Sequence, residues 1–187
     1  MKKRILVVFG TRPEAIKCAP VIKEFRKHKN VFDITIVTTA QHREMLDQVL
    51  GIFDITPHID LNIMLKNQSL AKITAVVISS MDKILKKNQY DLVLVQGDTT
   101  TAFSTSLVAF YNKVPVGHIE GGLRTFDKFN PYPEEINRQL ISLVADIHFA
   151  PTQLALNNLY AAGILRRNIF LTGNTAIDAL LYSLRKI

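Results

Sequence analysis

The sequence predicts an α/β fold with a doubly wound, mostly parallel, Rossmann-like sheet. Short apolar runs rich in β-branched residues alternate with longer amphipathic stretches along the chain, a pattern typical of strands that alternate with helices. The apolar runs are continuous, which indicates strands buried on both faces. The alternation predicts six β-α units. Since crossovers between parallel strands are right-handed, we expect a strand order such as 3-2-1-4-5-6.

The first β-α unit carries the clearest local signals. Residues 4–9 (RILVVF) form an unbroken apolar run that Gly10 closes, as expected of a buried strand. Thr11 has the side chain of a helix N-cap, and Pro13 suits the first helical turn. We expect this helix to continue to Lys27.

The later units repeat this pattern with different lengths. The expected strands cover residues 34–38, 92–95, 115–119, 147–150 and 169–171, and the expected helices cover 41–50, 69–87, 100–111, 134–144, 152–162 and 175–186. Residues 51–66 contain Pro57 and no sustained period, which predicts irregular structure. Residues 123–133 are expected to form a loop.

The amino-acid composition and the net charge limit the kinds of binding partner that we expect. The chain has 187 residues, of which 48% are hydrophobic and 21% charged, so general disorder is excluded. The net charge of +7 is compatible with nucleic acid, an anionic membrane surface or a phosphorylated small molecule. The lysines at 23, 27 and 29 have no interleaved aromatic residues, so we expect no nucleic-acid binding.

Compartment and membrane association follow from two further observations. Cys18 is the single cysteine, which excludes an intramolecular disulfide and a cysteine-rich zinc site and is typical of a reducing compartment. No apolar run approaches the roughly 18 residues that span a bilayer. We therefore expect a cytoplasmic protein with no membrane segment.

Charged residues gather at the predicted carboxyl ends of the strands. Ligands of open parallel sheets bind there, near the point where the strand order reverses, which we expect between the first strand and residues 92–95. The candidates are Arg12 and Lys17 after the first strand, Asp98 after residues 92–95, Glu120 after residues 115–119, and Glu134 and Glu135 at the start of a helix.

This set favours acid–base chemistry on a phosphorylated sugar. Arg12 and Lys17 could neutralise a phosphate, while clustered carboxylates separate their pKa values so that one holds a proton and another takes one. A magnesium site is a weaker alternative. Taken singly, Asp98 could cap a helix, and acids in a first turn favour the helix dipole. No G-x-G-x-x-G follows the first strand, so a dinucleotide cofactor has no support.

Seven segments together resemble one protein family. They are FGTRPEAIK (residues 9–17), TAQHREMLDQVL (39–50), DLNIM (60–64), GDTTTAF (97–103), PVGHIEGGLRT (115–125), PYPEEINR (131–138) and TGNTAIDAL (172–180). In this order they resemble the non-hydrolysing UDP-N-acetylglucosamine 2-epimerases of bacteria, over almost the whole chain.

The resemblance implies a GT-B architecture of two Rossmann-like domains that face each other across a cleft. Residues 1–187 resemble the amino-terminal domain alone, as a single domain; the second domain of relatives holds most UDP contacts and an active-site histidine. The implied reaction eliminates UDP from UDP-N-acetylglucosamine and adds it back to give UDP-N-acetylmannosamine. It requires no cofactor and no metal, and relatives serve cell-surface polysaccharide biosynthesis.

The resemblance also assigns roles to residues. Asp98, Glu120 and Glu134 would be catalytic, with the acid and the base among them left open, and Arg12 and Lys17 would bind substrate. Gln41 and His42 lie where some relatives bind a second UDP-N-acetylglucosamine as an activator, although residues 65–68 depart from the usual pattern. Gly121 stands where relatives usually have alanine.

Three functional hypotheses remain open at this point. The first is an epimerase, or the carboxylate-bearing half of one, that acts on UDP-N-acetylglucosamine and UDP and is inactive alone. The second is a non-catalytic remnant or a subunit that depends on a separate carboxyl-terminal half. The third is a hydrolysing 2-epimerase that releases N-acetylmannosamine and UDP. A homodimer is also possible, since relatives usually dimerise through this domain.

Overall fold

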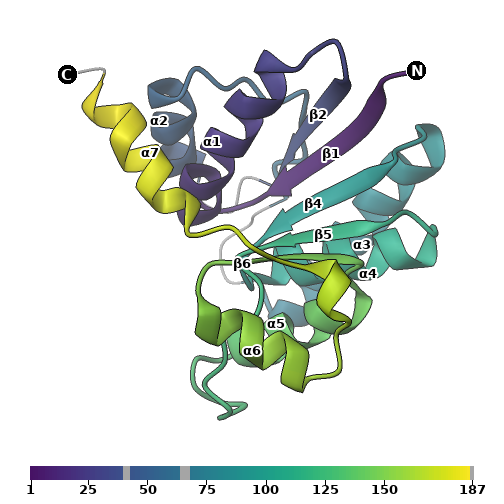
Figure 1. Cartoon of the computed structure of the whole chain (residues 1–187). Coiled ribbons are helices and arrows are strands. Elements are labelled where there is room, and N and C mark those ends of the chain that lie inside the picture. The colour runs from purple at the N-terminus through teal and green to yellow at the C-terminus, as the bar shows by residue number, and fades with distance from the viewer. Residues whose placement is uncertain (40–42, 64–67, 186–187) are drawn as a thin grey trace.

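The computed structural model describes residues 1–39, 43–63 and 68–185. They form one seven-stranded sheet in the order β3-β2-β1-β4-β5-β6-β7, in which every neighbouring pair is parallel (Figure 1). The strands are β1 (Lys3–Phe9), β2 (Phe32–Thr38), β3 (Ile59–Asp60), β4 (Leu92–Gln96), β5 (Val116–Ile119), β6 (Ile147–Ala150) and β7 (Ile169–Leu171). The predicted fold class, a doubly wound parallel α/β sheet, is confirmed.

A helix follows each strand along the chain. The helices are α1 (Arg12–Lys27), α2 (Arg43–Ile52), α3 (Leu70–Lys87), α4 (Thr100–Tyr111), α5 (Glu134–Val144), α6 (Gln153–Ala161) and α7 (Thr175–Leu184), and a short 3₁₀ helix covers Arg166–Asn168. Within the described ranges, no helix is long and apolar enough to cross a membrane.

The prediction of six strands, with residues 92–95 as the third, is wrong. The strand β3 lies in the segment expected to be irregular, and it makes β4 the fourth strand. It pairs with β2 at only two positions, Val37 with Ile59 and Thr38 with Asp60, and two residues are too few to show a strand period. With β3 included, the order of the first six strands is the expected one, and β4 lies beside β1 at the switch point.

The two faces of the sheet have separate cores because the side chains of each strand alternate. On β1, Val7 and Phe9 pack against α1 and α2, whereas Leu6 and Val8 pack on the opposite face with residues of α3 and α4. Figure 1 shows α1, α2 and α7 on one side of the sheet and α3, α4 and α5 on the other. Burial on both faces explains why the strand sequences are continuously apolar.

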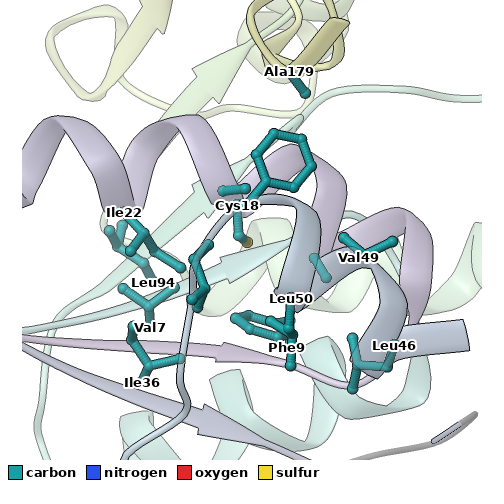
Figure 2. Packing of buried hydrophobic residues seen from close by; sticks show 14 of the residues in the cluster. Val7, Phe9, Cys18, Ile22, Ile36, Leu46, Val49, Leu50, Leu94 and Ala179 are labelled. Carbon is teal, nitrogen blue, oxygen red and sulfur yellow. The ribbon is translucent and has the colours of Figure 1, made fainter. Parts of the chain in front are cut away.

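The last helix returns across the sheet to the first. From β7, at one edge of the sheet, the chain crosses to place α7 beside α1 and α2 (Figure 1). Ala179 of α7 belongs to the same buried cluster as Cys18 and Ile22 of α1 (Figure 2). The start of α7 is thereby brought to the carboxyl ends of the central strands, where the candidate site lies.

Candidate functional site

A cavity of about 340 Å³ opens at the switch point between β1 and β4. It is lined by Thr11, Pro13, Glu14, Lys17, Gln96, Gly97, Asp98, Thr99 and Glu120. The structure therefore brings Lys17, Asp98 and Glu120 to one pocket, although Lys17 and Asp98 lie 81 positions apart in the sequence. All three come from the carboxyl-end loops of parallel strands or from the helix that follows, which is where such sheets bind ligands.

The carboxylate of Glu120 is held by three donors from three different elements. The amine of Lys17 on α1 and the side-chain amide of Gln96 on β4 each donate to Oε2 at 2.5 Å, and the amide of Asn174 donates to Oε1 at 3.1 Å. Glu120 itself has a φ of +65°, a left-handed backbone that is strained for this residue. Such strain persists where surrounding contacts over-determine the geometry.

Asp98 is held at both its carboxylate and its backbone. Arg138 of α5 donates to Oδ2 at 2.5 Å, and the amide of Asn137 donates to the carbonyl of Asp98 at 2.9 Å. Burial raises the pKa of Asp98, the nearby charge of Arg138 lowers it, and the negative charges of Glu134 and Glu120 raise it further, so the net shift is upward. Asp98 therefore takes up a proton more readily than an exposed aspartate.

The two acids at the start of α5 have different surroundings. Glu134 is partly exposed and does not line the pocket, but its charge is close enough to act on Asp98. Glu135 is fully buried and forms an ion pair with Arg138 at 3.4 Å. Burial alone would raise the pKa of Glu135, but hydrogen bonds from Gln139 and the backbone of Thr125 outweigh burial and lower it. Glu135 thus supports the arginine that holds Asp98.

The turn before Asp98 is fixed from the neighbouring strand. The Nε2–H of His118, which is fully buried on β5, donates to the carbonyl of Gly97 at 2.7 Å, and the Gly97 amide donates to the carbonyl of Ile119 at 2.9 Å. Gly97 has a φ of +70°, which glycine adopts without a steric penalty. Burial lowers the pKa of His118 to about 3, so the ring is neutral near pH 7 and its proton is on Nε2.

Glu14 ties together the N-termini of two helices. Its carboxylate accepts hydrogen bonds from the backbone amides of Gly10 and Thr11 and from the hydroxyls of Thr11 and Thr99, all within 2.9 Å. Thr11 caps α1 as the sequence predicts, in a capping box with Glu14. Thr99, and not Asp98, caps α4, so the capping explanation for Asp98 is wrong. Burial raises the pKa of Glu14.

Three further sequence candidates lie apart from this pocket or outside the described residues. Arg12 is exposed, does not line the pocket and has no ion pair with any residue that the structure describes. It is the first residue of α1, and its side chain leaves the helix on the solvent side. Gln41 and His42, the candidate regulatory residues, lie outside the described residues.

Several residues that hold the carboxylates were not singled out from the sequence. They are Gln96, Asn137, Arg138 and Asn174. The sequence carries a signal for two of them, Gln96 and Arg138. Gln96 is a polar residue that ends an otherwise apolar strand, LVLVQ. Arg138 lies four residues after Glu134 on the same helix, so both point to the same side.

The arrangement is suited to moving protons beside a negatively charged substrate. Two carboxylates, each paired with a cation, line one pocket, and Lys17 adds positive charge to its wall. Among the residues that the structure describes, no group of three or more His, Cys, Asp or Glu side chains could hold a metal ion. Cys18 is buried, and burial raises the pKa of its thiol, which makes it a poor nucleophile.

Comparison with known proteins agrees with the motifs. The family model described as UDP-N-acetylglucosamine 2-epimerase matches residues 23–187. The UDP-N-acetylglucosamine 2-epimerase of Neisseria meningitidis serogroup A is 55% identical over 184 residues, which cover 98% of this chain and 49% of that protein. The crystal structure of the N. meningitidis enzyme bound to UDP-GlcNAc has a TM-score of 0.95 at 56% identity and covers the same shares.

A more distant relative has the same fold. The Methanocaldococcus jannaschii UDP-GlcNAc 2-epimerase, solved in complex with UDP-GlcNAc and UDP, has a TM-score of 0.92 at 37% identity and covers 98% of this chain and 50% of that one. The chain thus spans about half the length of the curated relatives it matches. By the family model and by identity over nearly all of its residues, the chain belongs to the UDP-N-acetylglucosamine 2-epimerase family.

Proposed function

We propose that this chain supplies the carboxylate-bearing wall of an enzyme that interconverts UDP-N-acetylglucosamine and UDP-N-acetylmannosamine. One observation carries the proposal: Asp98, Glu120 and Lys17 line one pocket at the switch point of the sheet. Family membership supports the substrate class, because the N. meningitidis and M. jannaschii relatives were solved with UDP-GlcNAc.

The chemistry of epimerisation explains why more than one carboxylate is needed. The proton leaves C2 as UDP leaves C1, which gives 2-acetamidoglucal. UDP then adds back to C1 while a proton is delivered to the opposite face of C2. Transfer on opposite faces requires two acid–base groups. Asp98, Glu120 and Glu134 supply these groups, with the acid and the base among them left open. Asp98 and Glu120 line the pocket, and the charge of Glu134 acts on Asp98. Lys17 offsets negative charge near the departing diphosphate.

This wall forms only part of a closed site. Ligand pockets enclose most of a ligand of this size, whereas this chain spans about half the length of its relatives. We therefore expect the isolated chain to bind UDP weakly and to turn over slowly or not at all. Isothermal titration calorimetry with UDP measures the first point, and tight binding by the isolated chain would contradict dependence on a second half.

The test of activity uses this chain with the carboxyl-terminal half of a close relative supplied as a separate polypeptide. NMR detection of UDP-N-acetylmannosamine from UDP-N-acetylglucosamine is expected with both polypeptides and not with either alone. Absence of turnover by a folded, nucleotide-binding complex of the two halves would contradict the proposal. Free N-acetylmannosamine plus UDP as the only products would instead assign the chain to the hydrolysing class.

Carboxylate variants test the assignment of the pocket. Asp98→Asn and Glu120→Gln keep the shape of each side chain and remove its proton-transfer capacity, so kcat is expected to fall by roughly 10²- to 10⁴-fold. Asp33→Asn is the matched control, since Asp33 is an exposed aspartate on β2, and its activity is expected to equal that of the unmodified chain. Equal activity of all three variants would show that the pocket is not the reaction site.

A further inference from the structure

Among the residues that the structure describes, one carboxylate oxygen of Glu120 has a single side-chain donor. Oε2 accepts hydrogen bonds from Lys17 and Gln96, whereas Oε1 accepts its side-chain hydrogen bond from Asn174 at 3.1 Å. The terminal torsion of a glutamate is broad and roughly two-fold, and rotation about it moves both oxygens. The contact from Asn174 to Oε1 therefore restrains this torsion together with the contacts from Lys17 and Gln96 to Oε2.

Asn174 uses both ends of its amide. Its Oδ1 accepts the backbone amide of Ala176 at 3.0 Å and so caps α7, while its Nδ2 donates to Glu120. Because Oδ1 faces an N–H donor and Nδ2 faces a carboxylate acceptor, the amide has one satisfying orientation. Serine and aspartate also cap helices well, but neither reproduces the Nδ2 donor. Serine has one hydroxyl on a shorter side chain, and ionised aspartate only accepts hydrogen bonds.

The position of Asn174 is set by packing far from the pocket. Asn174 begins α7, whose Ala179 is buried against α1 in the cluster shown in Figure 2. Lys17, the cation on the other oxygen of Glu120, lies on the same α1. The two sides of the carboxylate are thus held by two helices that pack on each other.

We propose that Asn174 is a positioning residue for Glu120, which caps α7 with one end of its side-chain amide and orients the Glu120 carboxylate with the other. This inference rests on the proposed function, in which Glu120 transfers a proton. Proton transfer depends on the direction of the carboxylate, and a displacement of about 1 Å at a reacting group can lower a rate by 10²-fold.

Three variants separate the two roles of Asn174. Asn174→Ser keeps a capping oxygen and removes the Nδ2 donor to Glu120. Asn174→Asp keeps the cap and places a second carboxylate against Glu120. Asn174→Ala removes both the cap and the Nδ2 donor. Ser69→Ala is the control. The hydroxyl of Ser69 caps α3 by accepting the backbone amide of Lys72, and Ser69 does not line the pocket. Thermal unfolding is expected to stay near that of the unmodified chain for Asn174→Ser and to fall for Asn174→Ala.

The effect of each variant on activity is measured as kcat and KM in the two-polypeptide assay. We expect kcat to fall roughly tenfold to 100-fold for Asn174→Ser, and further for Asn174→Asp, with KM little changed and Ser69→Ala at full activity. If Asn174→Ser and Asn174→Asp keep full kcat while Asn174→Ala only loses stability, Asn174 is a helix cap alone and the inference is wrong.

An NMR measurement tests this inference independently of the proposed function. The ¹³C resonance of the Glu120 side-chain carboxyl can be followed in the 187-residue chain without turnover, after assignment with Glu120→Gln. It is expected to move in Asn174→Ser and Asn174→Asp and not in Ser69→Ala. An unmoved resonance overturns the inference whatever the activity. A moved resonance, together with an inactive unmodified complex, would instead show that the contact exists and that the proposed function is wrong.

Discussion

Two adjacent glycines follow Glu120, and they differ in backbone conformation and in the space available for a Cβ. Gly122 has a φ of +93°, and a Cβ there would lie 2.2 Å from the carbonyl oxygen of Ala155. Gly121 has no such left-handed backbone, and a Cβ would lie 3.2 Å from Nδ1 of His118. At Gly122 the neighbour is backbone and cannot withdraw, whereas at Gly121 it is a side-chain ring, which must shift by a few tenths of an ångström to admit a Cβ.

Replacement of these glycines by alanine is therefore expected to change stability in opposite directions. Gly121→Ala restricts the unfolded chain, which stabilises a protein by about 0.4–1 kcal/mol where the backbone permits. The shift of the His118 ring offsets part of this gain, and we expect the midpoint of thermal unfolding to rise by roughly 1–2 °C. Gly122→Ala is expected to destabilise by more than about 2 kcal/mol. A lower midpoint for Gly121→Ala would show that His118 cannot give way.

At the scale of residues, the sequence predicts well which loops bear the candidate site residues. It predicts poorly which other side chains form hydrogen bonds with those residues. Lys17, Asp98 and Glu120 could be placed together because the carboxyl ends of parallel strands meet at one edge. Asn174 could not, because its approach to Glu120 depends on α7 crossing back to α1, a long-range packing choice with no local signal. Arg12 has the charge of a phosphate ligand, but its position at the start of α1 leaves it exposed.

At the scale of elements, the N-termini of α1 and α4 are joined through one buried carboxylate. Thr99 accepts the backbone amide of Ala102 at 3.1 Å, as an N-cap does, and its hydroxyl donates to Glu14 at 2.7 Å. Thr152 caps α6 by the same contact to Ala155 at 3.1 Å and is exposed. The two threonines therefore make the same cap contact, and they differ in the buried carboxylate beside Thr99 and in the partial burial of Thr99.

Removal of the two caps is expected to separate the cost of a cap from the cost of an unpaired carboxylate oxygen. Thr152→Ala is expected to destabilise by about 1 kcal/mol. Thr99→Ala also removes a donor from buried Glu14, and we expect a total loss of about 2–4 kcal/mol. Urea unfolding of both variants gives the difference, with Thr99→Ser expected to recover most of it. Equal losses in the two alanine variants would mean that Glu14 is satisfied without Thr99.

The expected helices and strands agree with the structure where a hydrophobic pattern extends over many residues. They differ where the patterned segment is short. The strand β1 and helix α3 are long enough for their patterns to be read. The two-residue β3 is formed by pairing with β2 alone, and no local pattern encodes such a pairing. Gly51 is part of α2, which continues to Ile52, because a single glycine costs a helix only about 1 kcal/mol.

At the scale of the whole molecule, two buried histidines make the fold sensitive to acid. His118 and His148 face each other on the neighbouring strands β5 and β6, with ring centres 6.3 Å apart. Burial lowers the pKa of His118 to about 3 and that of His148 to about 4. Charging either ring without unfolding would place a cation in a region that already contains the guanidinium groups of Arg124 and Arg138, whose charges lower the pKa of His118 further.

The sign of the pH dependence follows from proton uptake. An unfolded histidine takes up its proton near pH 6.5, whereas the folded rings stay neutral to about pH 4 or below, so between these values the unfolded state binds more protons. Stability is therefore lost as the pH falls from 6.5 toward 4. Asp98 and Glu14 act in the opposite sense, because their raised pKa values let the folded state take up protons first.

A histidine variant isolates one of these opposing contributions. From pH 7 to pH 5, a buried neutral histidine is expected to reduce the free energy of unfolding by about 2 kcal/mol. His148→Leu removes that contribution and leaves Asp98 and Glu14 in place. It also removes the charge of His148, which lowers the pKa of His118, but burial still keeps that pKa below the range of the experiment. Urea unfolding at both pH values and constant ionic strength should show that the unmodified chain loses about 2 kcal/mol more than His148→Leu between them. Equal losses would mean that His148 is protonated in the folded chain at pH 5, and that acid reaches the core beneath the pocket before the chain unfolds.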